Sequence, residues 1–242
     1  MACRRIARAH SRAARSVIHV SRASAASAAI AAPIGKVKLI DREDGTKNRY
    51  VPFSRYLAKD VAKACDRAHA FETKLIRGFS FYHPRGERPE DHLEQAVDQI
   101  GQIAEACHRS DLTFGLEVEA NLVGQTGVLL AEIYRRVNHP GLVLIFDAAN
   151  LIVQGFSTAQ VYRQWEAMKP GLGWVHIKDY RKVAAKSRGR HVDEDTLANF
   201  VPADIGAGGH RKILADLREL LPALTRRLAR RRSRSVSPSR TS

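Results

Sequence analysis

Three side chains that can bind a metal ion stand at the ends of short apolar segments. Glu117 follows the segment TFGL, Asp147 follows LVLIF, and His176 follows GWV. Each segment is rich in strand-forming residues, and a stretch with helical periodicity follows each of them. Because the carboxyl ends of the strands in a parallel α/β barrel meet at one rim, two carboxylates and an imidazole there indicate a divalent-metal site.

Each of the three residues also has a purely structural interpretation when it is taken alone. Glu117 could form an ion pair at the barrel mouth, Asp147 could cap a helix or turn, and His176 could be a core residue. The metal hypothesis rests on their recurrence at equivalent places in three consecutive βα units. Carboxylates with one imidazole suit Mn²⁺, Mg²⁺, Co²⁺ or Zn²⁺, and the sequence does not choose among these cofactors.

Three further polar residues lie near the candidate ligands in the sequence, and we expect them to contact substrate. Asn150 follows Asp147 closely and could hydrogen-bond a substrate hydroxyl. Lys178 could bind a phosphate or carboxylate, with a solvated charge as the alternative. Glu119 shares a strand face with Glu117, because side chains alternate along a strand.

The elements that must position these residues alternate between strand and helix. Strands are expected to start near residues 74, 113, 142 and 173, which lie 39, 29 and 31 residues apart, and a fifth is expected at 33–39. This period is that of βα units and predicts a parallel sheet with right-handed crossovers. A closed barrel has eight strands. The predicted fold is therefore α/β, a partial parallel (β/α) TIM barrel.

Helix signals fill the intervals between the strands. Ser54, Pro89 and Ser157 are at positions typical of helix starts. Further helices are expected at about 126–137 and from Gly208-Gly209 to about Leu224. The long charged segment 182–204 has no regular pattern, and we expect it to cross the barrel mouth.

The positive charge of the chain is concentrated at its two ends. The formal net charge is +15, and residues 1–32 and 226–242 hold six and seven arginines with no acidic residue. Without these thirteen charges the middle of the chain carries about +2, so its composition favours no nucleic-acid partner. We expect a disordered Arg/Ala/Ser-rich segment at 1–32, the barrel domain at 33–224, and a disordered Arg/Ser-rich tail at 225–242.

Both ends have a functional alternative. The N-terminal composition is also that of an organellar transit peptide. The tail RRRSRSVSPSRTS could bind RNA, although it has no aromatic residue on which bases would stack.

The three cysteines and the hydropathy limit the location of the protein. Cys3, Cys65 and Cys107 form no CxxC motif, which favours buried thiols in a reducing, cytoplasmic compartment. The sequence contains no run of 18 apolar residues, so it predicts no membrane-spanning helix.

Several segments together resemble the xylose-isomerase-like TIM barrels, a superfamily of sugar-phosphate isomerases, epimerases and apurinic endonucleases. PIGKV and KLIRGFSFY are similar to its third and fourth strands, GLEVEAN to its LENEAN-type fifth strand, FDAAN to its sixth and VHIKDY to its seventh. VPADIGAGG resembles the VPAGxGxG loop before the last helix. The resemblance covers about residues 33–224, and strands 3–7 of 8 are recognisable.

The resemblance implies specific roles at matching positions. Glu117, Asp147 and His176 would bind a divalent metal, and Glu117 would also act as a catalytic base. The fourth ligand of the family is a glutamate in an LEP-type motif on the eighth strand, and no such motif follows Leu224. Nothing before Ala25 resembles the first two strands. We expect a truncated or frame-shifted form of a normal gene, with a natural remnant as the alternative.

The implied function is that of a metal-dependent isomerase or epimerase of a small sugar, sugar phosphate or keto acid, acting through an enediolate and impaired by the missing glutamate. One alternative is a catalytically inactive partial barrel, whose open edges would favour assembly into a homo-oligomer. Another is a hydrolase like the apurinic-site endonucleases. Those enzymes have a histidine three residues after the sixth-strand aspartate, where this chain has Asn150.

Overall fold

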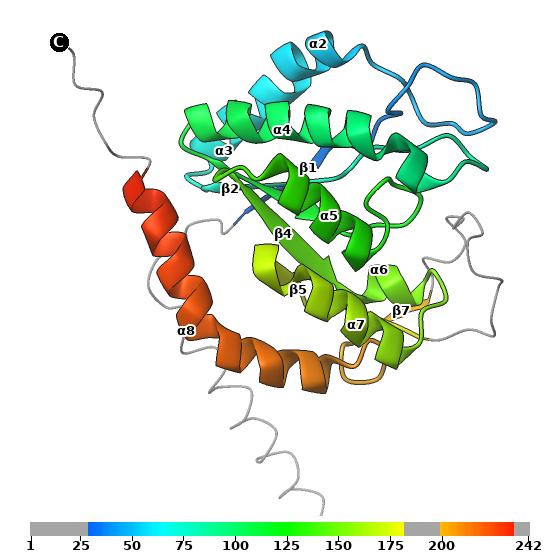
Figure 1. The fold of residues 1–242 in the computed structure, drawn as a ribbon, viewed down its shortest axis with the longest axis vertical. Coiled ribbons are helices and arrows are strands. Elements are labelled where there is room, and N and C mark those ends of the chain that lie inside the picture. The colour runs from blue at the N-terminus through cyan, green and yellow to red at the C-terminus, as the bar shows by residue number, and fades with distance from the viewer. Residues whose placement is uncertain (1–28, 182–198, 235–242) are drawn as a thin grey trace, which may run out of the picture.

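The computed structural model describes residues 29–181 and 199–234. Three segments for which predictions were made lie outside the described residues: 1–28, which includes Cys3, 182–198 and 235–242. The predictions for these segments stay predictions. The described part contains a five-stranded sheet whose strands lie side by side in chain order, each parallel to its neighbours (Figure 1). The strands are β1 (Ile30–Ile34), β2 (Leu75–Gly78), β3 (Thr113–Glu117), β4 (Leu142–Asp147) and β5 (Leu172–His176). The predicted α/β class is confirmed.

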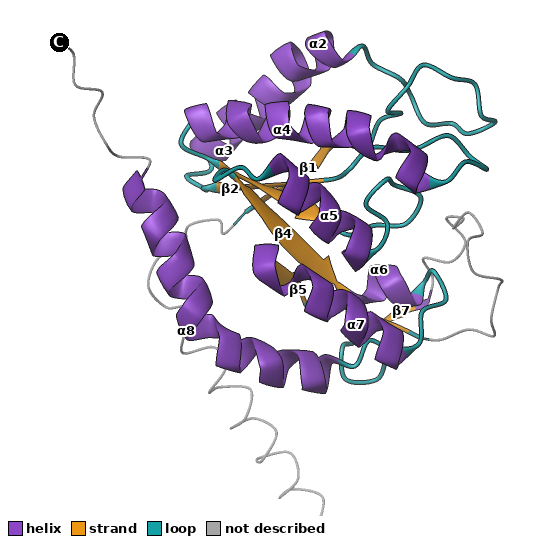
Figure 2. Ribbon diagram, viewed as in Figure 1, coloured by secondary structure: helices purple, strands orange, loops and turns teal. Residues whose placement is uncertain are grey.

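Helices connect successive strands, and α5 (Gly127–Val137) packs against both α4 (Leu93–Arg109) and α7 (Thr158–Met168) in front of the sheet (Figures 1 and 2). The connection from β1 to β2 is a loop at 35–52 followed by one continuous helical segment that includes a π-helical turn. The helices are α2 (Phe53–Tyr56), the π turn Leu57–Val61, α3 (Ala62–Ala70), the 3₁₀ turn Pro89–His92, α4 (Leu93–Arg109), α5 (Gly127–Val137), α6 (Ala148–Ile152), α7 (Thr158–Met168), the 3₁₀ turn Lys169–Gly171 and α8 (His210–Arg234).

Local sequence signals explain where the middle helices begin and end. The Thr126 side chain accepts a hydrogen bond from Leu129 N at 3.2 Å and so caps α5. Ser157 and Gln160 form a capping box at the start of α7. Asn138 ends α5 in the left-handed conformation, with φ of 44°, which Asn tolerates better than most residues.

The core lies between the sheet and its helices. All six residues of β4 are buried, which explains its unbroken apolar run, because a parallel strand is covered on both faces. Phe146 on β4 packs edge to face on Trp165 of α7, with ring centroids 5.1 Å apart. Gly78 on β2 leaves room for Phe114, since a Cβ at residue 78 would lie 2.4 Å from that ring.

The first strand was predicted in the wrong place. The expected strand at 33–39 is instead β1, which begins at Ile30 and ends at Ile34. Pro33 lies inside it, and the pairing with β2 shifts between Ala31 and Ile34. Proline lacks a backbone N–H and is tolerated at an edge strand next to such an irregularity, which the reading of Pro33 as a loop residue overlooked.

Two helices also differ from the predicted pattern. The short helix α6 was not expected, and it begins directly after Asp147, the N-cap. The last helix starts near the predicted Gly208-Gly209 but continues to Arg234, ten residues beyond Leu224. It contains Pro222, and its course changes direction about half-way in Figure 1, as expected where proline removes a helical hydrogen bond.

The segment after β5 forms a second, small sheet. The strands β6 (Asp179–Tyr180) and β7 (Phe200–Val201) pair in antiparallel fashion and frame the segment 182–198. Tyr180 and Phe200 pack edge to face with ring centroids 5.3 Å apart. This hairpin brings residues beyond the segment 182–198 back to the end of β5.

Cys65 and Cys107 are buried free thiols, as predicted for these two positions. Within the described residues, no helix combines the length and the apolar composition that spanning a membrane requires.

Candidate metal site

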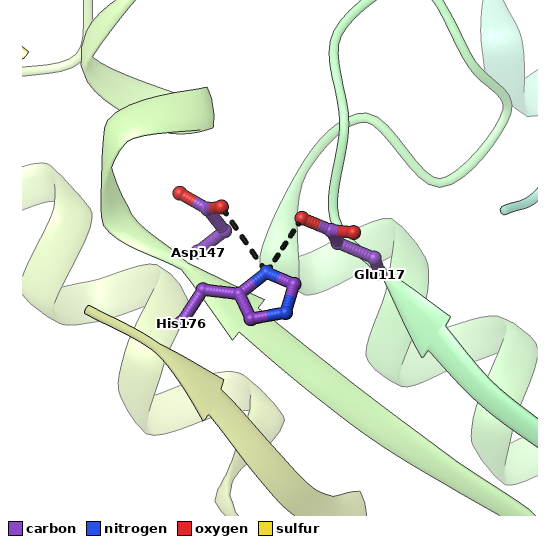
Figure 3. A group of neighbouring side chains, drawn as sticks. All are labelled: Glu117, Asp147 and His176. Atoms are coloured by element: carbon purple, nitrogen blue, oxygen red, sulfur yellow. Dashed lines mark hydrogen bonds and ion pairs between the residues drawn. The ribbon is translucent and has the colours of Figure 1, made fainter. Parts of the chain in front are cut away.

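Glu117, Asp147 and His176 lie together at the carboxyl ends of the neighbouring strands β3, β4 and β5 (Figure 3). The strand register produces this cluster, because Asp147 is the direct pairing partner of His176 and Glu117 pairs with Ile145. One ligand atom from each of the three residues lies within 4.8 Å of the others. The sequence therefore identified side chains that the fold does bring together.

The imidazole of His176 lies between the two carboxylates. Its Nδ1 is 2.9 Å from Glu117 Oε1 and 3.4 Å from Asp147 Oδ2. Interaction with Asp147, followed by that with Glu117, raises the pKa of His176 to about 9, because both carboxylates favour the charged ring. In this arrangement the histidine is a cation at neutral pH and compensates part of the buried negative charge.

Asp147 is fully buried and uses its two oxygens differently. Oδ1 accepts a hydrogen bond from Asn150 N at 3.3 Å and caps α6, whereas Oδ2 lies 3.0 Å from Lys178 Nζ. Burial is the largest influence on the pKa of Asp147 and raises it, but His176 and Lys178 together outweigh burial and bring the pKa below its ordinary value. The helix cap and the candidate ligand are thus the same residue.

Asn150 fixes the position of Glu117. Its Nδ2 donates to Val118 O at 3.0 Å and to Glu117 Oε1 at 3.4 Å, and Asn150 is buried. The same side chain was predicted to bind a substrate hydroxyl. In the structure its amide group donates to these two oxygens and so links Glu117 on β3 to α6, and its contact with a substrate hydroxyl stays a prediction.

Arg77 is a site residue that the sequence reasoning missed. Its Nη1 lies 3.1 Å from Glu117 Oε2, and its guanidinium group stacks over Phe79 at 4.7 Å from the ring centroid. The signal in the sequence was an arginine within the β2 strand, two positions before Phe79 and on the face opposite the apolar Ile76. Arginine at such a position is costly unless a carboxylate faces it.

Glu119 lies two residues beyond the end of β3 and forms an ion pair with Lys36. Lys36 Nζ lies 3.0 Å from Glu119 Oε2 and 4.3 Å from the centroid of Phe79. Phe79 therefore has contacts with two cations, Lys36 and Arg77, each of which also pairs with a glutamate. Of the three predicted substrate contacts, Lys178 reaches Asp147, Asn150 reaches Glu117 and Glu119 faces Lys36.

The chemistry of this donor set fits a divalent ion. Glu117 Oε2 and Asp147 Oδ2 are buried and accept no well-aligned hydrogen bond from the residues that the structure describes. An ion bound at about 2.1 Å would bring its ligands within about 4.2 Å of one another, so separations within 4.8 Å require only small shifts. Two carboxylates and one imidazole are suitable ligands for Mn²⁺, Zn²⁺ and related ions.

Comparisons with known proteins identify the family. The sequence model of the family described as "Xylose isomerase-like TIM barrel" matches residues 54–224, well over half of the chain. The chain belongs to this family. The match confirms the predicted resemblance and the predicted TIM-barrel fold class. A search of curated proteins gave no match.

Solved structures support the same fold. The probable 3-DHS dehydratase AsbF of Bacillus anthracis is 19% identical with a TM-score of 0.54, and the alignment covers 70% of this chain and 62% of that one. A xylose isomerase domain protein from Planctomyces limnophilus is 20% identical with a TM-score of 0.53, covering 69% and 55%. A xylose isomerase-like TIM barrel protein from Mycobacterium smegmatis in complex with magnesium is 15% identical with a TM-score of 0.51, covering 69% and 58%. This chain thus spans 55–62% of the length of these three proteins.

Proposed function

We propose that this protein is a metal-dependent isomerase or epimerase whose substrate is a small sugar, sugar phosphate or keto acid. The observation that carries the proposal is the convergence of Glu117, Asp147 and His176 at the carboxyl ends of three adjacent strands. In TIM-barrel enzymes this end of the strands is where catalytic groups are placed. The cofactor proposed is Mn²⁺, Mg²⁺, Co²⁺ or Zn²⁺, and the proposed setting is the cytoplasm.

The reaction would remove a proton from the hydroxyl-bearing carbon next to a carbonyl group. A proton would then return either from Glu117 to the former carbonyl carbon, which is isomerisation, or from water to the opposite face of the same carbon, which is epimerisation. A bound divalent ion would polarise neighbouring carbonyl and hydroxyl oxygens and stabilise the negative charge of an enediolate. Glu117, one of its ligands, would remove the proton from the substrate carbon. Asn150 and Arg77 would keep this carboxylate in place, since both contact it in the structure. Lys178 and Glu119 are the groups we propose to face substrate.

A thermal unfolding experiment tests the metal site. Saturation with Mn²⁺ or Co²⁺ at about 100 times the dissociation constant should stabilise the fold by about 2.7 kcal/mol, or about 5–10 °C in Tm. Glu117→Gln should remove this shift because an amide is a poor ligand for these ions. Glu119→Gln changes the neighbouring carboxylate, which faces Lys36, and should keep the shift. A wild-type Tm that no divalent ion changes would refute the metal site.

A second measurement tests the chemistry. The loaded protein is incubated in D₂O with small ketoses, their phosphates and short keto acids, and loss of the carbon-bound proton is followed by ¹H NMR. Exchange that requires both the ion and Glu117 supports the proposal. A clear metal-induced shift in Tm without exchange of any compound would instead favour the alternative of a catalytically inactive partial barrel.

One feature of the fold favours that alternative. Within the described residues, β1 pairs in the sheet only with β2 and β5 only with β4, so the described part of the sheet does not close into a barrel. Open edges favour association with another copy of the chain, and a homo-oligomer detected by sedimentation would be consistent with either function. The endonuclease alternative has less support, because Asn150 stands where those enzymes have a histidine and its amide contacts Val118 and Glu117.

A further inference from the structure

The two ligand carboxylates each carry a second cation besides His176. Arg77 Nη1 lies 3.1 Å from Glu117 Oε2, and Lys178 Nζ lies 3.0 Å from Asp147 Oδ2. Glu117 and Asp147 are almost completely buried, and a buried carboxylate without a cation is strongly destabilising. The two basic side chains therefore supply charge compensation in the place where a divalent ion would supply it.

The two cations differ in whether they obstruct an ion. Glu117 presents Oε1 to His176 and Oε2 to Arg77, so one oxygen can bind an ion while the other keeps its arginine. In Asp147, Oδ1 accepts the backbone hydrogen bond from Asn150 N that caps α6. Oδ2 accepts no well-aligned hydrogen bond from the described residues, which makes it the better placed oxygen for an ion, and it is the oxygen that Lys178 contacts.

Lys178 can also move away from Asp147 more easily than Arg77 can move away from Glu117. Its side chain is 43% exposed, whereas that of Arg77 is 25% exposed and stacked on Phe79. The ammonium group has a second partner already in place, the ring of Phe200 on β7, whose centroid is 4.8 Å from Nζ. A lysine can therefore move off Asp147 without losing every favourable contact.

We propose that Lys178 is an internal counter-ion of Asp147 that a divalent ion must displace, and that it thereby sets the metal affinity of the site. An ion and a lysine ammonium on the same oxygen would repel each other at short range, so only one occupies Oδ2. Once displaced, the ammonium group remains at the mouth of the site, where it can meet an anionic substrate. This inference rests on the proposed metal site and adds a determinant of its affinity.

Calorimetric titration of the full chain with Mn²⁺ alone tests this role. Lys178→Met removes the charge and keeps an unbranched apolar stem, and it should tighten the dissociation constant about tenfold, or about 1.4 kcal/mol. Lys178→Arg keeps a cation and should leave the constant within about twofold of wild type. Arg77→Met should have a smaller effect than Lys178→Met, because Glu117 has a second oxygen, Oε1, through which an ion can bind without displacing Arg77 from Oε2.

Two controls keep the result interpretable. Lys212→Met removes a lysine that stacks on Tyr162 at 3.5 Å, away from Asp147, and should not alter Mn²⁺ binding. Circular dichroism and thermal unfolding without metal show whether each variant folds. If Lys178→Met does not fold, Lys178→Gln replaces it as the neutral variant.

The outcomes separate this inference from the proposed function. Tighter binding by the neutral variants supports the counter-ion role. Unchanged or weaker binding by them, with measurable binding by wild type, overturns it and leaves the metal site intact. Binding by the neutral variants but not by wild type supports the counter-ion role and contradicts metal-dependent catalysis by the native chain. No binding by any variant overturns both.

Discussion

Two buried aspartates, Asp147 and Asp179, have contrasting environments. Asp147 is surrounded by side-chain cations and has one oxygen without a well-aligned hydrogen bond from the described residues. Asp179 is equally buried, but its Oδ1 accepts from Tyr180 N at 2.7 Å and from Gly208 N at 2.8 Å. Backbone donors cannot be exchanged for an ion, whereas side-chain cations can. The comparison separates a carboxylate that holds a loop from one that can bind a ligand.

The loop at Gly206–Gly208 packs so closely on Asp179 that larger side chains do not fit in it. A Cβ at residue 206 would lie 2.1 Å from Asp179 Cγ, so only glycine fits there. His210 at the start of α8 lies 3.6 Å from Asp179 Oδ2 and contacts Lys178 O through Nε2 at 2.8 Å. These contacts join the loop, α8 and the end of β5, which carries the candidate site.

Asp179→Ala should have the largest effect on stability. It leaves two buried backbone N–H groups and His210 without their carboxylate, and the free energy of unfolding should fall by about 3 kcal/mol. Urea denaturation of the metal-free protein measures this. Asp98→Ala on the exposed surface of α4 is the control and should cost less than about 0.5 kcal/mol. An equal loss in both variants would contradict the structural role of Asp179.

Asp147→Asn should affect metal binding much more than folding. Asparagine also caps helices well, so α6 is retained and the loss of stability should be smaller than for Asp179→Ala. The Mn²⁺ affinity should fall about a hundredfold, or about 2.7 kcal/mol, because a neutral amide replaces a charged ligand. Calorimetry and urea denaturation of the same variant measure both quantities. A large loss of stability with unchanged affinity would show that Asp147 is only a helix cap.

The stability of the metal-free protein should depend on pH through His176. Its pKa is about 9 in the folded protein against an ordinary value of 6.5, so the charged ring stabilises the fold fully below pH 6.5. This contribution is lost as the pH rises through 9. After allowance for solvent screening of the partly exposed ring, we expect a loss of about 1–2 kcal/mol between pH 6.5 and 9. Urea denaturation at several pH values should show a flatter profile for His176→Gln, and an identical profile would contradict this assignment.

Much of the fold was predictable because its elements are coded locally. Apolar segments placed β2 to β5 within a few residues, and Ser157 and Thr126 marked helix starts through their own hydrogen bonds. The first strand was misplaced because Pro33 reads as a loop residue unless the strand is known to lie at an edge. The short helix α6 was missed because its five residues are too few to show a helical period.

The sequence by itself determined the alternation of β2 to β5 with the longer helices, the family, and the three candidate ligands. Each of these depends on residues next to one another in the chain, and strand ends in a parallel sheet necessarily meet at one edge. The tertiary structure alone decided that Arg77 faces Glu117, that Lys178 contacts Asp147, and that the loop at Gly208 is bound to Asp179. Those contacts join residues from separate strands and loops, and they depend on strand register and side-chain direction, which local sequence patterns do not specify.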